Sequence, residues 1–248
     1  MIPTSETKPI EPQVGESPFE ICACGYPSAS AIRSLSIDGP SGRLEAVLNE
    51  GAPDAPFAAL VCHPHPLYGG SLHNKVVYHA MKVLNDPVWG FSYPVLRFNF
   101  RGTGISQGTH DGEAEFGDVL AAMTWLHTHF HRPLVVAGFS FGAAMALNAC
   151  SRSEPIHDKL HALVALGLPT TLDLPAYRYT TLKTCTTPKL FVSGDRDQFA
   201  PPAQLSHVVS SAAEPKSLVI LPGADHFFNG HLELMQQTIA NWLKERMP

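Results

Sequence analysis

Two short stretches of the chain hold a serine between two glycines in the pattern Gly-x-Ser-x-Gly. They are GISQG at residues 104–108 and GFSFG at residues 138–142. This pattern is typical of a sharp turn from a strand into a helix that presents a nucleophilic serine, because small residues let the crowded backbone pass. One chain is not expected to use both stretches, so their surroundings decide which serine is the nucleophile.

The second stretch has the surroundings that such a turn needs. PLVVAG (133–138) is typical of a buried strand, and an alanine-rich helix is expected to begin at Gly142. A helix N-terminus favours negative charge beside the serine hydroxyl. Around Ser106, RGT separates the preceding strand from the motif and the polar THDGE follows it, so that stretch is interpreted as a glycine-rich loop. Ser140 is therefore the predicted nucleophile.

A nucleophilic serine needs a histidine as general base and a carboxylate that orients the histidine. Downstream, the strand KLFVSG precedes DRDQFAPP and the strand LVILPG precedes ADHFF. Of the 13 histidines, His226 is the best placed, because it follows a strand by a short loop. Asp195 directly follows its strand and is expected to hold the loop through backbone N–H groups, whereas Asp197 lies nearer the histidine loop. We favour Asp197 as the orienting acid, while the alternative that both aspartates cap the helix beginning near Pro201 stays open.

Segments typical of strands and helices alternate along most of the chain. An antiparallel hairpin is expected at residues 31–39 and 42–50, followed by six strands separated by helices. These strands are expected at 57–62, 93–100, 133–138, 161–168, 188–194 and 217–223. The alternation predicts an α/β class fold, an eight-stranded, mostly parallel, doubly wound sheet with helices on both faces. Ligands of such sheets bind at the carboxyl ends of the strands, where the candidate serine, aspartate and histidine all fall.

The composition is that of one soluble globular domain. The chain has 248 residues, 44% of them hydrophobic and 16% charged, with a net charge of −5. This charge favours neither nucleic acid nor a membrane surface as a partner. Residues 1–20 are rich in Pro, Glu, Ser and Thr without the pattern of a signal peptide, so a flexible arm is expected before a single domain at 21–248. The five cysteines favour reduced thiols in the cytoplasm, and neither a metal nor another cofactor is expected.

The stretches GFSFG, GDRD and GADHF resemble the nucleophile elbow, the acid loop and the histidine loop of the α/β-hydrolase superfamily. The resemblance extends from about residue 31 to the end, and FRGTGIS is similar to the superfamily's glycine-rich loop after the fourth strand. HPHPLYGGSLHNKVV resembles a subgroup of small bacterial hydrolases near the dienelactone hydrolase and esterase branches. In the superfamily the acid falls at the fourth position of Gly-x-x-Asp, which supports Asp197.

The resemblance also implies an oxyanion hole, with one backbone N–H from the loop after the third strand and one from the residue after the nucleophile. The two prolines of HPHP have no N–H, which leaves His65 or Leu67 in that loop. We prefer His65, with Phe141 as the second donor. His63 is expected to be structural and to tie the loop down with its ring.

The segment at residues 169–187, where many relatives carry a lid, is too short for a helical domain. An open, minimally capped site is therefore expected, with Leu67 and Tyr68 in contact with the substrate. Only Arg196 brings a cation into the catalytic loops, which does not favour a strongly anionic substrate. The predicted function is a serine hydrolase, a carboxylesterase that cleaves small esters through an acyl-enzyme on Ser140. A thioesterase or small peptidase with the same triad, and a ligand-binding receptor that retains the fold, stay open, as does the oligomeric state.

Overall fold

The computed structural model describes residues 31–150, 155–172 and 177–246. The flexible arm predicted at residues 1–20 lies outside the described residues. The same holds for residues 21–30, at the start of the predicted domain.

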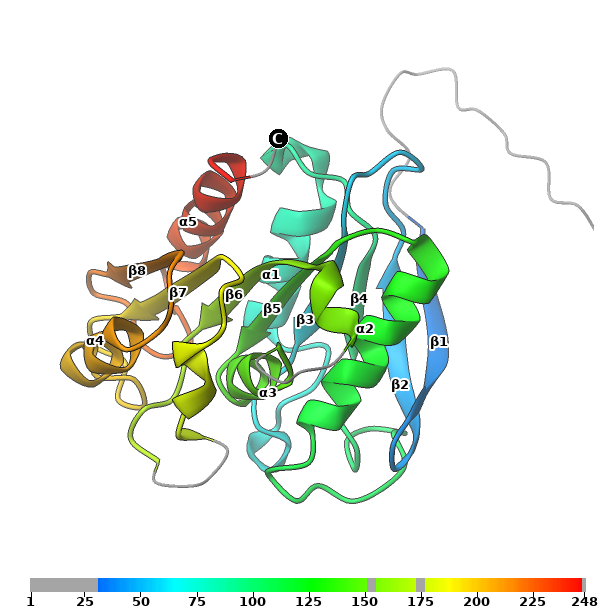
Figure 1. Ribbon diagram of the computed structural model, residues 1–248, viewed down its shortest axis with the longest axis horizontal. Coiled ribbons are helices and arrows are strands. Elements are labelled where there is room, and N and C mark those ends of the chain that lie inside the picture. Colours follow the sequence, from blue (N-terminus) through cyan, green and yellow to red (C-terminus); the bar gives the residue numbers. More distant parts are fainter. Residues whose placement is uncertain (1–30, 151–154, 173–176, 247–248) are drawn as a thin grey trace, which may run out of the picture.

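The centre of the protein is one eight-stranded sheet with the strand order β1-β2-β4-β3-β5-β6-β7-β8 (Figure 1). Pairing is antiparallel from β1 to β2 and from β2 to β4, and parallel elsewhere. The predicted α/β class, the initial hairpin and the mostly parallel sheet are confirmed. The strands are β1 (Ile32–Gly39), β2 (Gly42–Asn49), β3 (Ala58–Cys62), β4 (Val95–Phe98), β5 (Leu134–Phe139), β6 (Leu160–Leu166), β7 (Lys189–Gly194) and β8 (Lys216–Leu221).

Helices cover both faces of the sheet (Figure 1). One face packs against α2 (Phe116–Phe130), α3 (Phe141–Cys150) and α4 (Pro202–Ser210), and the other against α1 (Lys75–Asn85) and α5 (Leu232–Lys244). Because neighbouring strand residues point to opposite faces, Leu60 lies in the first core and Val61 in the second. The connections, as far as the structure describes them, contain the short 3-10 turns η1 (Pro66–Tyr68), η2 (Pro87–Trp89), η3 (Pro155–Lys159) and η5 (Thr180–Lys183).

The helix after β3 begins later than the hydrophobic periodicity predicts. The pattern starts at Ser71, but α1 starts at Lys75. Asn74 caps the helix, because its side chain accepts a hydrogen bond from the N–H of Val76. The N–H of Leu72 bonds instead to the side chain of Asn99 at 2.8 Å. The chain before α1 is thus held to the end of β4 and stays outside the helix.

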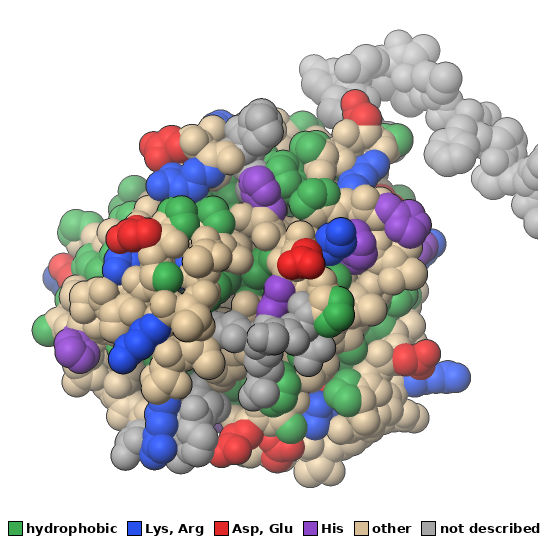
Figure 2. Space-filling model, viewed as in Figure 1, with side chains coloured by type: hydrophobic (Ala, Val, Ile, Leu, Met, Phe, Trp, Pro, Cys, Tyr) green, Lys and Arg blue, Asp and Glu red, His purple; other side chains and the backbone are tan. Residues whose placement is uncertain are grey.

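The uncharged stretch at residues 133–150 divides into β5, a turn at Ser140 and α3, as the sequence predicts. No helix in the described part of the chain is long and apolar enough to cross a bilayer. On the face covered by α2, α3 and α4, acidic and basic side chains are interspersed among apolar ones (Figure 2). The expectation that the protein has no nucleic-acid partner stays a prediction.

Candidate active site

Ser140 lies at a sharp turn between β5 and α3. Its φ angle is 54°, in the left-handed region that residues other than glycine rarely adopt. The N–H of Ser140 donates to the carbonyl of Leu166 at 2.9 Å, which ties the turn to β6. The carbonyl of Ser140 accepts from Ala143 and Ala144 in the first turn of α3. A strained serine between a strand and a helix has the geometry of a nucleophile elbow.

The two glycines of this motif are required because the turn passes very close to its neighbours. A Cβ atom added at Gly138 would lie 2.4 Å from the carbonyl oxygen of Gly142. One added at Gly142 would lie 2.4 Å from the carbonyl oxygen of Cys62, at the end of β3. A side chain at either position would therefore displace the serine between them.

Ser106, in the other Gly-x-Ser-x-Gly stretch, has a different environment. It is 8% exposed. Its hydroxyl donates to the carbonyl of Asn99 at 2.7 Å and accepts from the N–H of Glu45 at 2.9 Å. The hydroxyl thus holds the loop after β4 against β2 both as a donor and as an acceptor. These contacts are those of a structural serine.

The predicted serine, histidine and aspartate come together at the carboxyl ends of β5, β7 and β8. Nε2 of His226 lies 3.0 Å from Oγ of Ser140. On its other side, Nδ1 of His226 lies 2.9 Å from Oδ2 and 3.0 Å from Oδ1 of Asp197. A carboxylate accepts hydrogen bonds, so the ring proton is assigned to Nδ1. Nε2 is then left as the acceptor that faces the serine hydroxyl.

Asp197 is 2% exposed and its carboxylate has several donors. Burial acts to raise the pKa of Asp197, but hydrogen bonds from His226, Phe199 and Ser193 outweigh it and hold the pKa below the usual range. Oδ1 accepts from the N–H groups of Phe199 and Ala200, and Oδ2 accepts from the hydroxyl of Ser193. The carboxylate is therefore ionised and fixed in place beside the imidazole.

Asp195, the competing aspartate, lies elsewhere in the same loop. Its side chain is exposed, and its Oδ1 accepts a hydrogen bond from the N–H of Gly223 at 2.7 Å. This contact joins the acid loop to the turn that leads to His226. Asp195 thus holds a loop through a backbone N–H, and Asp197 is the aspartate that contacts the histidine.

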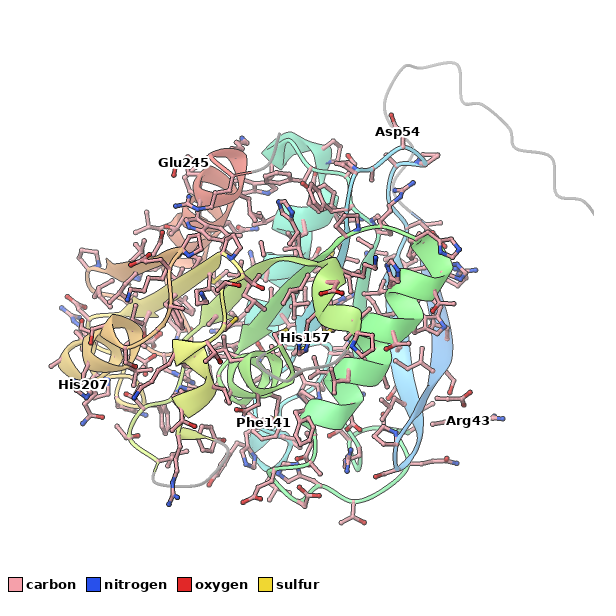
Figure 3. All side chains as sticks on the ribbon, in the orientation of Figure 1. Arg43, Asp54, Phe141, His157, His207 and Glu245 are labelled. Carbon is pink, nitrogen blue, oxygen red and sulfur yellow. The ribbon has the colours of Figure 1, made fainter. Side chains whose placement is uncertain are left out.

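The residues predicted to form the oxyanion hole lie against each other. The rings of His65 and Phe141 have centroids 5.0 Å apart, and Figure 3 labels Phe141 at the start of α3. Within the described residues, neither backbone N–H of this pair donates to another protein atom. The N–H of Leu67 instead points to Nδ1 of its neighbour His65, at 3.3 Å. The geometry thus favours His65 over Leu67 as the donor of this loop.

His63 sits directly before this loop and is completely buried. Its Nε2 accepts the N–H of Phe100 at 3.0 Å, so the ring proton is on Nδ1, which donates to the carbonyl of Pro64 at 2.6 Å. The ring thus connects the ends of β3 and β4, which is the structural role expected from the sequence. Burial lowers the pKa of His63 from 6.5 to about 4.

The depressed pKa of His63 predicts a loss of stability in mild acid. In the unfolded chain this histidine binds a proton as the pH falls through 6.5, whereas in the folded protein it stays neutral down to about pH 4. Stability therefore falls between these values, by about 3 kcal/mol for this one group. Denaturant titrations at pH 7 and pH 4.5 measure the loss. The His63→Gln variant, which has no titrating ring, should lose less over the same interval, and parallel losses in both proteins would disprove the assignment.

Exposed apolar side chains flank the serine on two sides. Phe199 and Phe227 pack on the ring of His226, with centroids 4.7 and 5.2 Å away. On the oxyanion side, Leu67 and Tyr68 are 76% and 88% exposed. The two predicted substrate contacts therefore lie on the surface beside the site. Further apolar surface lies beside the histidine, where Phe199 and Phe227 pack on its ring.

Lys75 is a cation near the site that the sequence analysis does not anticipate. It begins α1, yet its amine lies 6.0 Å from the ring centroid of Phe227 and bonds to the side chain of Asn229. Burial acts to raise the pKa of Asp225, but the hydrogen bonds from Asn229 and Phe227 and the charge of Lys75 outweigh it and hold the pKa below the usual range.

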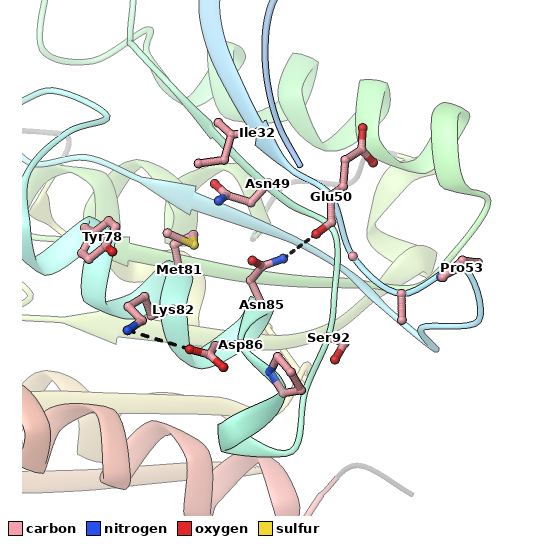
Figure 4. Close-up of a pocket in the computed structure, with 13 residues that line it drawn as sticks. Ile32, Asn49, Glu50, Pro53, Tyr78, Met81, Lys82, Asn85, Asp86 and Ser92 are labelled. Atoms are coloured by element: carbon pink, nitrogen blue, oxygen red, sulfur yellow. Dashed lines mark hydrogen bonds and ion pairs between the residues drawn. The ribbon is translucent and has the colours of Figure 1, made fainter. Parts of the chain in front are cut away.

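A hollow lies at the opposite end of the strands from Ser140 (Figure 4). It has a volume of about 590 Å³ and lies between the end of β2, the end of α1 and the segment before β4. Its polar side chains are already engaged, since Asn85 donates to the carbonyl of Glu50 and Lys82 pairs with Asp86. Ser140 does not line this hollow.

Comparison with known proteins agrees with this architecture. Residues 78–245 match the model of the alpha/beta hydrolase domain family. This match covers more than half of the chain, so the protein belongs to the α/β-hydrolase family. The resemblance to the α/β-hydrolase superfamily is confirmed, as is the expectation of a hydrolase, while the narrower resemblance to the dienelactone hydrolase and esterase branches stays a prediction.

Individual relatives extend the match over most of the chain. The uncharacterized protein RP471 of Rickettsia prowazekii is 36% identical over 218 residues, which are 84% of this chain and 87% of the relative. The crystal structure of XC6422 from Xanthomonas campestris, a serine hydrolase without a lid, is 30% identical with a TM-score of 0.75, covering 90% of this chain and 97% of the other. A serine hydrolase homologue from Coxiella burnetii is 31% identical, also with a TM-score of 0.75, covering 85% and 97%.

Proposed function

We propose that the protein is a serine hydrolase that cleaves small carboxylic esters through an acyl-enzyme on Ser140. The observation that carries this proposal is the continuous contact from the Ser140 hydroxyl to Nε2 of His226 and from Nδ1 to the carboxylate of Asp197. A serine becomes a nucleophile when a neutral imidazole accepts its proton and a carboxylate holds the imidazole in the right tautomer. Each of these conditions has a matching contact in this site.

The reaction follows from the positions of these atoms. Oγ of Ser140 attacks the ester carbonyl carbon while its proton passes to Nε2 of His226. The imidazolium then gives the proton to the leaving alcohol as the bond between the carbonyl carbon and the alcohol oxygen breaks. Water, activated by the same histidine, attacks the acyl-enzyme and releases the carboxylic acid. Asp197 stays ionised throughout and stabilises the imidazolium.

The backbone N–H groups of His65 and Phe141 stabilise the negative charge that develops on the carbonyl oxygen. Preorganised donors of this kind act more strongly on the transition state than on the uncharged ester. The strain at Ser140, with φ of 54°, also favours an enzyme over a receptor that merely retains the fold, because strain of this kind is typically kept where function needs it.

The surroundings of Ser140 support a small, uncharged substrate with an apolar part. Leu67, Tyr68, Phe199 and Phe227 provide apolar surface on both sides of the serine without enclosing it. The structural relative XC6422 is described as a serine hydrolase without a lid. An open site contacts only the part of an acyl chain nearest the carbonyl, so length beyond a few carbons adds little binding energy.

This openness predicts the chain-length preference of the enzyme. Hydrolysis of p-nitrophenyl acetate and butyrate should be faster than that of the palmitate ester, and should disappear in Ser140→Ala. The rate should rise smoothly with substrate concentration, because the proposed site is already open before it meets an oil–water surface. A sharp rise in rate at the solubility limit of a long-chain ester would show that a part of the chain covers the site. Thioesters and peptide substrates assayed in parallel distinguish the other acyl transfers that the same triad supports.

A further inference from the structure

His110, in the loop between β4 and α2, forms a triangle of rings with the two residues of the proposed oxyanion hole. Its ring centroid lies 4.8 Å from that of His65 and 5.4 Å from that of Phe141, both at steep angles. His65 and Phe141 complete the triangle at 5.0 Å. The two backbone donors thus come from different segments, the loop after β3 and the first residue of α3, and the ring of His110 contacts the rings of both.

The ring of His110 is itself held by a buried acid. Nδ1 of His110 lies 2.6 Å from a carboxylate oxygen of Glu115, and the two side chains are 9% and 0% exposed. Nδ1 has no hydrogen-bond partner among the described residues, so Glu115 is a close neighbour of the ring rather than its hydrogen-bond acceptor. Glu115 also accepts from the N–H groups of Asp111 and Gly112. The acid thereby lies against the ring and fixes the backbone that follows it.

The loop that carries His110 is anchored at both ends. The guanidinium of Arg101 bonds to the carboxylate of Asp118 in α2 at 2.7 Å and to the carbonyl of Ala114 at 3.0 Å. A Cβ atom added at Gly102 would lie 2.9 Å from the backbone nitrogen of His110. The start of the loop, at Gly102, and its later part, at His110, are therefore in close contact. Because the loop is anchored, the ring of His110 stays in place and restricts the movement of the rings packed against it.

We infer that His110 is a positioning residue of the oxyanion hole, which acts through the rings of His65 and Phe141 rather than by touching the substrate. This inference rests on the proposed function. Oxyanion donors are effective only when they are already placed where the charge will develop. Each donor sits on a backbone whose side chain packs against His110, so a missing ring leaves a void into which both can shift. Such a shift weakens binding of the transition state more than binding of the ester.

The inference predicts a particular pattern of kinetic constants. His110→Ala should lower kcat by about ten- to a hundredfold and leave KM within about twofold, because the affected interaction forms mainly in the transition state. His110→Phe restores a planar ring of similar size without the ring nitrogen that faces Glu115, and should recover kcat to within about threefold of the parent. His207→Ala, on α4 and away from the triangle (Figure 3), is the matched control and should keep both constants.

The test measures kcat and KM on p-nitrophenyl butyrate for the parent and the three variants, with the folded fraction of each determined by thermal unfolding. The fluorophosphonate labelling of Ser140 in the parent reports on the proposed function independently of His110. A folded His110→Ala with unchanged kcat, or a loss of kcat that the phenylalanine variant does not recover, would overturn the inference while leaving the triad in place. If His110→Ala does not fold, His110→Leu takes its place, because leucine fills the space without a planar ring. Equal kcat values in the leucine and phenylalanine variants would then overturn the inference.

Discussion

Replacing His226 by glutamine should remove nearly all ester hydrolysis, by a factor on the order of 10⁴ or more. Glutamine cannot accept the proton of Ser140, whose hydroxyl lies 3.0 Å from Nε2 of the histidine in the native site. The protein should still fold, because His226 sits on a loop at the edge of the sheet. Steady-state rates on p-nitrophenyl butyrate, with circular dichroism to confirm folding, measure the effect.

His65→Ala is the matched histidine control for this experiment. The variant keeps the backbone N–H that is proposed to bind the oxyanion and loses the ring that accepts the N–H of Leu67. We expect it to cost roughly ten- to a hundredfold in kcat, much less than the loss of the general base. If His65→Ala were as damaging as His226→Gln in a folded protein, the His65 side chain would have a catalytic role that the present site does not include.

Asp197→Asn should reduce turnover by roughly 10²- to 10⁴-fold. Oδ1 of Asp197 accepts the N–H groups of Phe199 and Ala200, so the amide oxygen of asparagine would keep that position. The amide NH₂ would then occupy the position of Oδ2, which faces Nδ1 of His226 at 2.9 Å. Two donors cannot face each other, so the ring proton would move to Nε2, where it blocks transfer from the serine.

Asp195→Asn provides the comparison within the same loop. The native side chain accepts one hydrogen bond from Gly223 through Oδ1, and the amide oxygen of asparagine can accept it equally well. Turnover should therefore stay within about threefold of the parent. Equal losses in the two variants, measured under the same conditions, would mean that the orienting acid has been misassigned.

The preference for Ser140 over Ser106 was accessible from the sequence because it depends on local order. A strand, a turn with glycines and a helix follow each other directly around Ser140, and the backbone clashes at Gly138 and Gly142 show why those positions hold glycine. The alternation of strands and helices along the chain was accessible for a similar reason, since buried strands and amphipathic helices differ in period. The acid and the histidine could be placed because each follows its strand within a few residues.

The contacts of His110, Glu115 and Lys75 were not accessible in this way. His110 is 45 residues from His65 in the chain, and the sequence pattern around it is that of an ordinary polar turn. Lys75 lies in a helix whose start the periodicity placed too early, and its neighbour Asn229 is 154 residues away. Such contacts depend on how loops from different strands pack at one edge of the sheet. The order of the strands brings the loops to that edge but does not determine which side chains meet.

The central claim is that Ser140 is the nucleophile, and labelling by a fluorophosphonate probe tests it most directly. The probe forms a covalent bond to a serine only where a base activates the hydroxyl and donors stabilise the phosphoryl oxygen. Peptide mapping should place the label on Ser140 in the parent protein. The label should disappear in Ser140→Ala and persist in Ser106→Ala, since the Ser106 hydroxyl is engaged with Asn99 and Glu45. Labelling that survives Ser140→Ala in a folded protein would contradict the claim.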